Sequence, residues 1–99
     1  MLENDDLDSL LTGKPSERER VKMEHEYMHK AASHPIRRQI VREIGAFGAT
    51  KDDILKAVDV DEKVFRYHTE FLINGDLLSM LEGKYFLTEK GLEILANIK

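Results

Sequence analysis

The amino-acid sequence predicts a mainly α fold with one small β-hairpin. Several segments repeat apolar residues at the three- and four-residue spacing of an amphipathic helix. Two of these segments are separated only by a short turn at 58–61. Further along, two short apolar runs flank Glu82-Gly83-Lys84, which has the composition of a tight hairpin connection. The predicted order of elements is therefore α-α-α-α-β-β-α.

The first helix of the closely joined pair is predicted to begin at Thr50. Threonine is a good N-cap, and Asp53 places a carboxylate in the positively polarised first turn. Three apolar residues share one face of this helix: Ile54, Leu55 and Val58. In the turn that follows, Asp59 tolerates a left-handed backbone, and Asp61 can cap the next helix.

The second helix of the pair is predicted to run from Asp61 to a C-cap at Asn74-Gly75. Its inner face carries Phe65, Thr69 and Leu72. Two helices that meet across a turn this short form the helix-turn-helix pattern. The second helix of that pattern is the one that enters the major groove of DNA.

Candidate DNA-binding residues lie on the outward face of this second helix: Glu62, Lys63, Arg66 and Tyr67. Arginine can pair with both acceptors on a guanine edge, and lysine or tyrosine can reach phosphate or base. Thr50 and Lys51, at the start of the preceding helix, are further candidates. The alternative interpretation of the same charges is an ordinary solvated helix face.

The C-terminal third predicts a wing and a closing helix. Strands are expected over 77–81 and 85–87, and Thr88 is expected to cap a helix that ends near Ala96. The residues of that helix expected to face inward are Leu92, Leu95 and Ala96. This order of elements is that of a winged helix-turn-helix. The short wing tip carries one basic residue, Lys84, so we expect only a small DNA contribution from it.

The N-terminal half predicts two more helices. The first covers 16–32, where Ser16 and Glu19 match a capping box. An apolar stripe on it predicts packing in the core or in a dimer interface, and consists of Val21, Met28 and Ala32. The second helix begins at Pro35, capped by Ser33 or His34. Its inward stripe consists of Ile36, Ile40, Val41 and Ile44.

Three arginines lie opposite that inward stripe: Arg37, Arg38 and Arg42. They are expected either to form a solvated face or to touch the DNA backbone. Two glycines, Gly45 and Gly48, end the helix, and Phe47 between them is expected to fill the core.

The segment His25-Glu26-Tyr27-Met28-His29 fits the H-E-x-x-H pattern of zinc peptidases. A catalytic zinc needs a third protein ligand in a supporting fold. The other candidates are His34, beyond the helix end, and His68, which the helix-turn-helix pattern assigns elsewhere. We therefore expect exposed histidines here and neither enzyme activity nor a metal. A metal-sensing or pH-sensing histidine pair remains the alternative.

Composition narrows the class of protein. The chain has 99 residues, enough for one small domain, and no cysteine, so no disulfide framework or thiolate metal site is possible. Residues 1–14 read as an acidic, flexible tail, and 15–99 as a single winged-helix domain. The formal net charge of −4 argues against binding of nucleic acid through bulk charge. With no apolar run of bilayer length and no signal segment, the expected location is cytoplasmic.

Three segments carry a family resemblance. Residues 32–40, ASHPIRRQI, resemble the "hP-[IL]-R-x-x-I" opening of ArsR-like (arsenical-repressor-like) regulators. Residues 64–72, VFRYHTEFL, are similar to the recognition helix common in the archaeal branch of these regulators. Residues 85–91, YFLTEKG, resemble the wing exit shared with MarR-like regulators. The resemblance implies that the four candidate residues of the second helix face DNA, with His68 in a partly buried position behind them.

These observations predict a sequence-specific DNA-binding transcriptional regulator, specifically a repressor, that acts on double-stranded DNA as a homodimer. The helix over 16–32, together with the closing helix, would pair the subunits. No cofactor is expected, and no small-molecule effector is evident. The alternative is a winged-helix module that binds other proteins and not DNA, which the acidic balance and the short wing favour.

Overall fold

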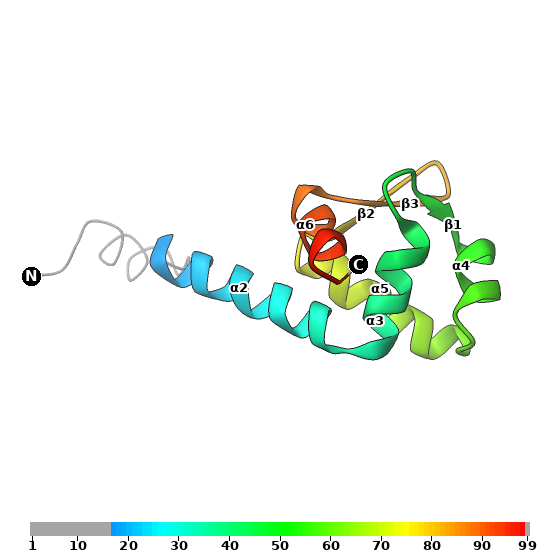
Figure 1. The fold of residues 1–99 in the computed structure, drawn as a ribbon, viewed down its shortest axis with the longest axis horizontal. Helices are drawn as coiled ribbons and strands as arrows, with labels where there is room; N and C mark the ends of the chain where they lie inside the picture. The colour runs from blue at the N-terminus through cyan, green and yellow to red at the C-terminus, as the bar shows by residue number, and fades with distance from the viewer. Residues whose placement is uncertain (1–16, 99) are drawn as a thin grey trace, which may run out of the picture.

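The helices and strands follow the predicted order with one addition. The structure is a computed structural model that describes residues 17–98. In chain order the elements are α2 (Glu17–Ser33), α3 (Pro35–Ile44), β1 (Ala49–Thr50), α4 (Lys51–Ala57), α5 (Glu62–Asn74), β2 (Leu78–Leu81), β3 (Lys84–Leu87) and α6 (Glu89–Ile98) (Figure 1). The predicted mainly helical fold with a small hairpin is confirmed. The predicted acidic tail and the Ser16 part of the capping box lie outside the described residues.

Side-chain caps fix the starts of four helices. Before α4, Thr50 Oγ1 accepts a hydrogen bond from the Asp53 N–H at 3.2 Å. Asp61 Oδ1 accepts from the Val64 N–H at 2.9 Å before α5. Thr88 Oγ1 accepts from the Gly91 N–H at 3.2 Å in α6. At α3, His34 Nδ1 accepts from the Ile36 N–H at 3.2 Å, with Pro35 at the first helical position. The predicted caps are therefore confirmed, with His34 and not Ser33 capping α3.

The turn between α4 and α5 differs from the prediction in its backbone. Among described non-glycine residues only Asp76 and Glu82 have positive φ, so the expected left-handed Asp59 is wrong. Val58 instead ends α4 in an extended conformation, and the Val60 N–H donates to the Val58 carbonyl at 2.9 Å. The Val58 side chain is buried and holds the turn against the core. An extended turn needs no left-handed residue.

The end of α5 depends on a close approach by α2. Gly75 is the C-cap, as predicted, but its φ is −84°, and the left-handed residue is Asp76 with φ 60°. A methyl group at Gly75 would come within 2.5 Å of Tyr27 Cδ1. The position therefore requires glycine because the Tyr27 ring lies against the backbone.

The sheet has one more strand than expected. Its order is β1-β3-β2, with both pairs antiparallel, and Thr50 lies opposite Lys84. The β2–β3 turn consists of Glu82 and Gly83, both with positive φ, as a two-residue hairpin with type I′ character requires. Lys84, predicted to lie in the turn, is the first residue of β3. No periodic pattern marks β1 in the sequence, because the strand is only two residues long.

A core of buried residues lies between the helices and one face of the sheet, and consists of Ala31, Ile40, Val41, Ile44, Ala49, Ile54, Val58, Phe65, Leu72, Leu77, Leu78, Tyr85, Ile94 and Leu95. Phe47 does not belong to it, contrary to the prediction, because its side chain is 89% exposed. Gly45 and Gly48 have positive φ on either side of it, and the Phe86 ring lies against Gly48. Phe47 is therefore turned outward.

The inward face of α6 was predicted only in part. Leu95 and Ile94 are buried, whereas Leu92 is 40% exposed and Ala96 is exposed. Gly91 lies directly against the backbone of Leu77. This close approach sets the rotation of α6 and leaves Leu92 on the outer side.

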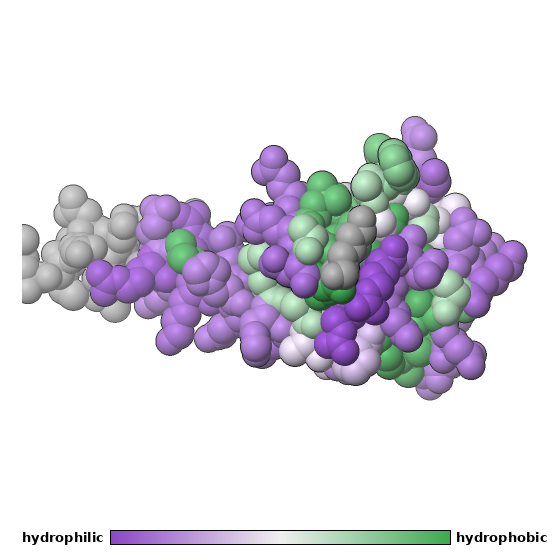
Figure 2. All heavy atoms as spheres, in the orientation of Figure 1, coloured by the Kyte–Doolittle hydropathy of each residue, from purple (hydrophilic) through white to green (hydrophobic). Residues whose placement is uncertain are grey.

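The N-terminal half of α2 projects away from the rest of the described chain (Figure 1). Val21 and Met23 there are 46% and 49% exposed, and Ala31 is the one fully buried residue of α2. On the face shown in Figure 2, hydrophilic side chains cover most of this projection, and hydrophobic ones gather over α6. Among the described residues, no helix combines the length and the apolar character that crossing a membrane would require.

Candidate nucleic-acid interface

The starts of α4 and α5 lie together, because the extended turn brings α5 back beside α4. Lys51 Nζ and Glu62 Oε1 form an ion pair of 3.0 Å between the first residues of the two helices. A small cavity of about 70 Å³ lies beside this pair. Its lining consists of Lys51, Glu62, Phe65, Arg66, Thr69 and Tyr85. Three of the predicted site residues, Lys51, Glu62 and Arg66, are therefore neighbours.

The outward face of α5 presents the charged and aromatic side chains that the helical spacing predicted. Lys63 and Arg66 are exposed, and Tyr67 is 62% exposed. On the inner side, Phe65 packs edge-on against Tyr85 with ring centroids 5.8 Å apart. Thr69 is buried, and its hydroxyl donates to the carbonyls of Phe65 and Arg66. One side of α5 is thus packed against the core, and the other side is exposed to solvent.

The wing residue Lys84 lies apart from this group. Tyr85 faces the cavity beside Arg66, and side chains alternate along a strand, so Lys84 extends from the opposite face of the sheet. Its ammonium lies 6.0 Å from the centre of the Phe86 ring. Thr50 pairs with Lys84 across the strands, but its hydroxyl is used in capping α4.

The three arginines of α3 differ in exposure: Arg42 is exposed, Arg38 is half-buried and only Arg37 is buried, which corrects the prediction for that residue. Arg37 is only 6% exposed. Its Nε–H donates to Nδ1 of His68 on α5 at 3.0 Å, and its Nη1 donates to the Lys30 carbonyl at 3.3 Å. Its guanidinium lies 3.6 Å from the centre of the Phe71 ring. Arg37 therefore ties α2, α3 and α5 together and cannot reach a DNA phosphate from this position.

The other two arginines also bind backbone carbonyls. Arg38 Nη1 donates to the carbonyls of Ala32 and Ser33, at 3.0 and 2.9 Å, at the end of α2. Arg42 Nη2 donates to the Ile98 carbonyl at the end of α6, at 3.1 Å. Cationic side chains commonly satisfy the free carbonyls at helix ends. The one sequence signal for this role is that Arg37 and Arg38 follow the end of α2 so closely.

His68 lies behind the exposed face and is 4% exposed. Its ring contacts those of His34 and Tyr67, with centroid distances of 4.4 and 5.0 Å. Burial, with the nearby His34 and Arg37, lowers the pKa of His68 below its ordinary value. His68 is thus a neutral side chain that accepts a hydrogen bond from a permanent cation.

A second electrostatic cluster fastens α2 to α6. Lys90 Nζ lies 2.8 Å from Glu24 Oε1 and 3.6 Å from Asp76 Oδ2. The hydrogen bond from Lys90 lowers the pKa of Glu24, and the same bond raises the pKa of Lys90. Both effects favour the charged forms and hold α2 near the base of the hairpin.

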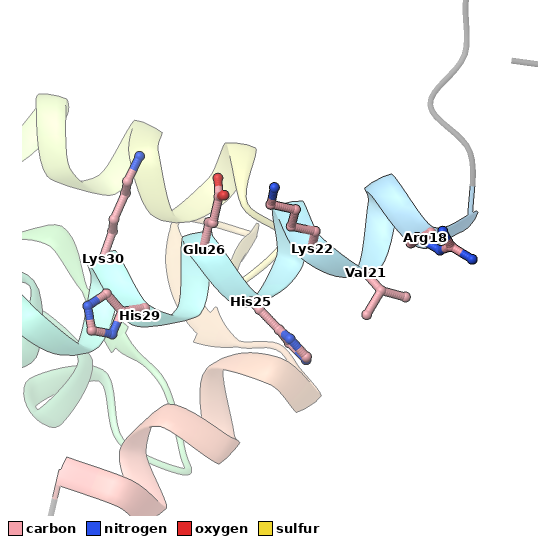
Figure 3. Close-up of a pocket in the computed structure, with 7 residues that line it drawn as sticks. All are labelled: Arg18, Val21, Lys22, His25, Glu26, His29 and Lys30. Carbon is pink, nitrogen blue, oxygen red and sulfur yellow. The ribbon is translucent and has the colours of Figure 1, made fainter. Parts of the chain in front are cut away.

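His25 and His29 lie along the projecting helix. Figure 3 shows them on α2, with His25 and Glu26 extending from opposite sides of the helix. His25 and His29 line an open hollow of about 540 Å³, and its lining within the described residues comes from α2: Arg18, Val21, Lys22, His25, Glu26, His29 and Lys30. Among residues 17–98 no group of three or more histidine, aspartate or glutamate side chains is placed to hold a metal ion together.

Comparison with known proteins agrees with this architecture. A family model described as winged helix-turn-helix matches residues 32–99. Two proteins of Archaeoglobus fulgidus, both named "Uncharacterized protein", are 35% identical to this chain over 80 and 79 residues. Each match covers 80% of this chain, and 94% and 91% of the respective relatives.

A winged helix-turn-helix domain suggests DNA binding, and proteins with this domain are typically not enzymes. The matched region begins at the end of α2 and contains α3, the α4–α5 pair, the three-stranded sheet and α6. The chain belongs to the winged helix-turn-helix family.

Proposed function

We propose that this protein is a sequence-specific DNA-binding regulator of transcription that places α5 in the major groove. The observation that carries the proposal is the contrast between the two sides of α5. Its inner side is fixed by Phe65, Thr69 and His68, all buried. Its outer side offers Lys63, Arg66 and Tyr67 to the solvent. A reading helix needs both properties, because base contacts require side chains held on a rigid element.

The charges around α5 support local rather than bulk attraction of DNA. The full chain carries a formal net charge of −4, so the protein as a whole repels a polyanion. At the start of α5, however, Lys51 is held by Glu62 next to Arg66. An approaching phosphate can compete with the Glu62 carboxylate for Lys51. We therefore assign Lys51 and Lys63 to phosphate contacts and Arg66 to a base edge.

We further propose that the regulator is an ArsR-like repressor that acts as a homodimer in the cytoplasm. In this proposal residues 15–99 fold as one domain behind an acidic tail at 1–14. The projecting half of α2 exposes Val21 and Met23, and α6 exposes Leu92, so these two helices offer apolar area for pairing subunits. A twofold pair would place two α5 helices in successive major grooves, about 34–36 Å apart.

The test begins with selection of bound duplexes from a random pool by the purified protein. Binding of the selected duplex by Arg66→Ala is then compared with wild type in a mobility-shift assay. Loss of one bidentate base contact costs ~1–3 kcal/mol of binding free energy. The matched control is Arg20→Ala, which removes an exposed arginine from α2 and is expected to bind like wild type. Equal binding by Arg66→Ala and wild type would contradict the proposed reading face.

A protein-interaction module is the second candidate function. One observation favours it: the sheet and the loop before it expose Phe47 at 89%, Leu81 at 65% and Met80 at 53%. Such exposed apolar side chains can supply contact area to a protein partner. The two functions differ in salt dependence, because DNA binding weakens steeply as salt displaces the protein from phosphates. Failure to enrich any duplex, or salt-independent weak binding, would favour this second function.

A further inference from the structure

A buried polar cluster joins the back of α5 to α3, and the DNA contacts proposed above do not use it. Its centre is the hydrogen bond between Arg37 Nε and His68 Nδ1, 3.0 Å long. The two side chains are 6% and 4% exposed. Within the described part of the chain, no carboxylate lies within ion-pair distance of either side chain. A buried cation is therefore held by a neutral imidazole, a carbonyl and an aromatic face.

The direction of this hydrogen bond fixes the protonation state of His68. The guanidinium of arginine is always protonated and can only donate. Nδ1 of His68 must therefore present its lone pair, and the single ring proton of the neutral form must lie on Nε2. Protonation of Nδ1 removes the acceptor and places a second positive charge against Arg37.

The surroundings of His68 offer no compensation for that second charge. The titratable groups that face it are Arg37 on α3, His34 before α3, and Tyr67 beside it on α5. His34 uses its own Nδ1 to accept the Ile36 N–H, so its ring is held in place next to His68. From α2, the backbone carbonyl of Lys30 accepts from Arg37. Two positive charges and no negative one would then share a buried space.

The cluster is also directly connected to the proposed reading face. His68 follows Tyr67 in α5, and the two rings meet edge to face. Arg37 lies 5.8 Å from the centre of the Tyr67 ring and 3.6 Å from that of Phe71. The position of α5 relative to α3 therefore depends on groups that surround one titratable nitrogen.

We propose that protonation of His68 releases α5 from α3 and weakens DNA binding, so that the proposed regulator responds to acid. This inference rests on the proposed function for its effect on DNA, but the structural part stands independently. The direction of this pH effect follows from the difference in the pKa of His68 between the unfolded and the folded chain. The unfolded chain binds the proton near the ordinary pKa of 6.5, whereas the folded state resists it. The attachment is intact above 6.5 and is lost only as the pH falls through the lowered pKa of His68 in the folded protein.

The structural part is tested first, on the full-length wild-type protein without DNA. Nitrogen-15 NMR of the histidine rings distinguishes a ring protonated on Nε2 from one protonated on Nδ1 or on both nitrogens. At neutral pH, His68 is expected to show an unprotonated Nδ1 and a protonated Nε2, and to take up its second proton below the ordinary pKa of 6.5. A proton on Nδ1 at neutral pH, or titration at or above that ordinary pKa, would overturn the inference whatever the protein binds.

The functional part compares affinities for the selected duplex from about pH 7.5 down to below the NMR midpoint of His68, at constant salt. The wild type is expected to lose affinity on acidification, by up to about tenfold per pH unit for each chain bound, which is the limit for one linked proton. His68→Asn keeps an acceptor for Arg37 but cannot titrate, so it is expected to lose this dependence. The control His29→Asn removes an exposed histidine and should keep it.

The outcomes separate the two proposals. If no duplex is bound at neutral pH, the proposed function fails, and the NMR titration still decides whether the attachment depends on His68. If the duplex is bound and His68→Asn retains the wild-type pH dependence, the acid response fails while DNA binding stands. If His68→Asn does not fold, as judged by circular dichroism, the pH at which wild-type affinity falls is compared with the pH midpoint of the His68 titration measured by NMR. The loss of wild-type affinity must then follow the titration of His68, and a different midpoint would contradict the inference.

Discussion

Basic residues on α3 and α5 resemble each other in sequence and differ in their hydrogen-bond partners. Arg37, Arg38 and Arg42 on α3 each donate to a carbonyl or to His68. Lys63 and Arg66 on α5 are exposed. The difference arises from location, because α3 starts against the end of α2 and runs beside the end of α6, where free carbonyls need donors. Lys63 and Arg66 of α5 cap no helix end in the described part of the chain and are available for a ligand.

The largest effect that tests this comparison is expected for Arg37→Ala. The substitution removes a buried charge-assisted hydrogen bond, worth roughly 1.5–3 kcal/mol, and leaves the acceptor on His68 unpaired. It also removes the contact with Phe71. We expect the free energy of unfolding, measured by urea denaturation, to fall by about 3 kcal/mol. Arg66→Ala is the control, and its stability should lie within about 0.5 kcal/mol of wild type because the side chain is exposed.

A smaller effect is expected for Arg38→Ala. Its two carbonyl acceptors lie at the partly exposed end of α2, where water can replace the lost donor. The free energy of unfolding should fall by roughly 0.5–1.5 kcal/mol. The result should be measured beside Arg37→Ala under the same conditions. Equal losses for the two variants would show that burial of Arg37 adds nothing, contrary to the structure.

The pH dependence of stability sharpens the comparison further. Because the folded state lowers the pKa of His68, the unfolded chain takes up its proton first. Stability should therefore be highest above 6.5 and decline below it, whereas His68→Asn should lack this part of the decline. The measurement is urea denaturation of both proteins across the same pH range. A wild-type protein that becomes more stable relative to His68→Asn as the pH falls from about 7 to about 5.5 would contradict the expected direction of this pH dependence.

The smallest expected effect concerns Glu62→Gln on α5. Removing the carboxylate frees Lys51 from its ion pair and takes one negative charge from the proposed interface. Exposed ion pairs contribute only about 0–1 kcal/mol, so stability should hardly change. Affinity for the selected duplex should rise slightly, and its salt dependence should steepen as Lys51 gains a phosphate. Weaker binding would show that Glu62 itself contacts a base.

The parts of the structure that the sequence predicted are those that depend on local contacts. Thr50, Asp61 and Thr88 cap helices through bonds to backbone only three residues away. Such bonds follow from the residue type and its place before an apolar run. The outward face of α5 followed for the same reason, from helical spacing alone.

The parts that were missed depend on what lies opposite in space. Phe47 was expected inside, but the adjacent glycines and Phe86 turn it outward. Arg37 was expected outside, and its acceptor His68 is separated from it by 31 residues. The rotation of α6 depends on the contact of Gly91 with Leu77. No local pattern marks such partners in a single sequence.

The central claim is that the outer face of α5 binds DNA, and an NMR titration with the selected duplex tests it most directly. Backbone amide signals of Lys63, Arg66 and Tyr67 should shift first and most strongly, followed by that of Lys51. Signals of Phe47, Met80 and Leu81 should move little. Shifts confined to those three apolar residues or to the projecting half of α2, with α5 unchanged, would contradict the account.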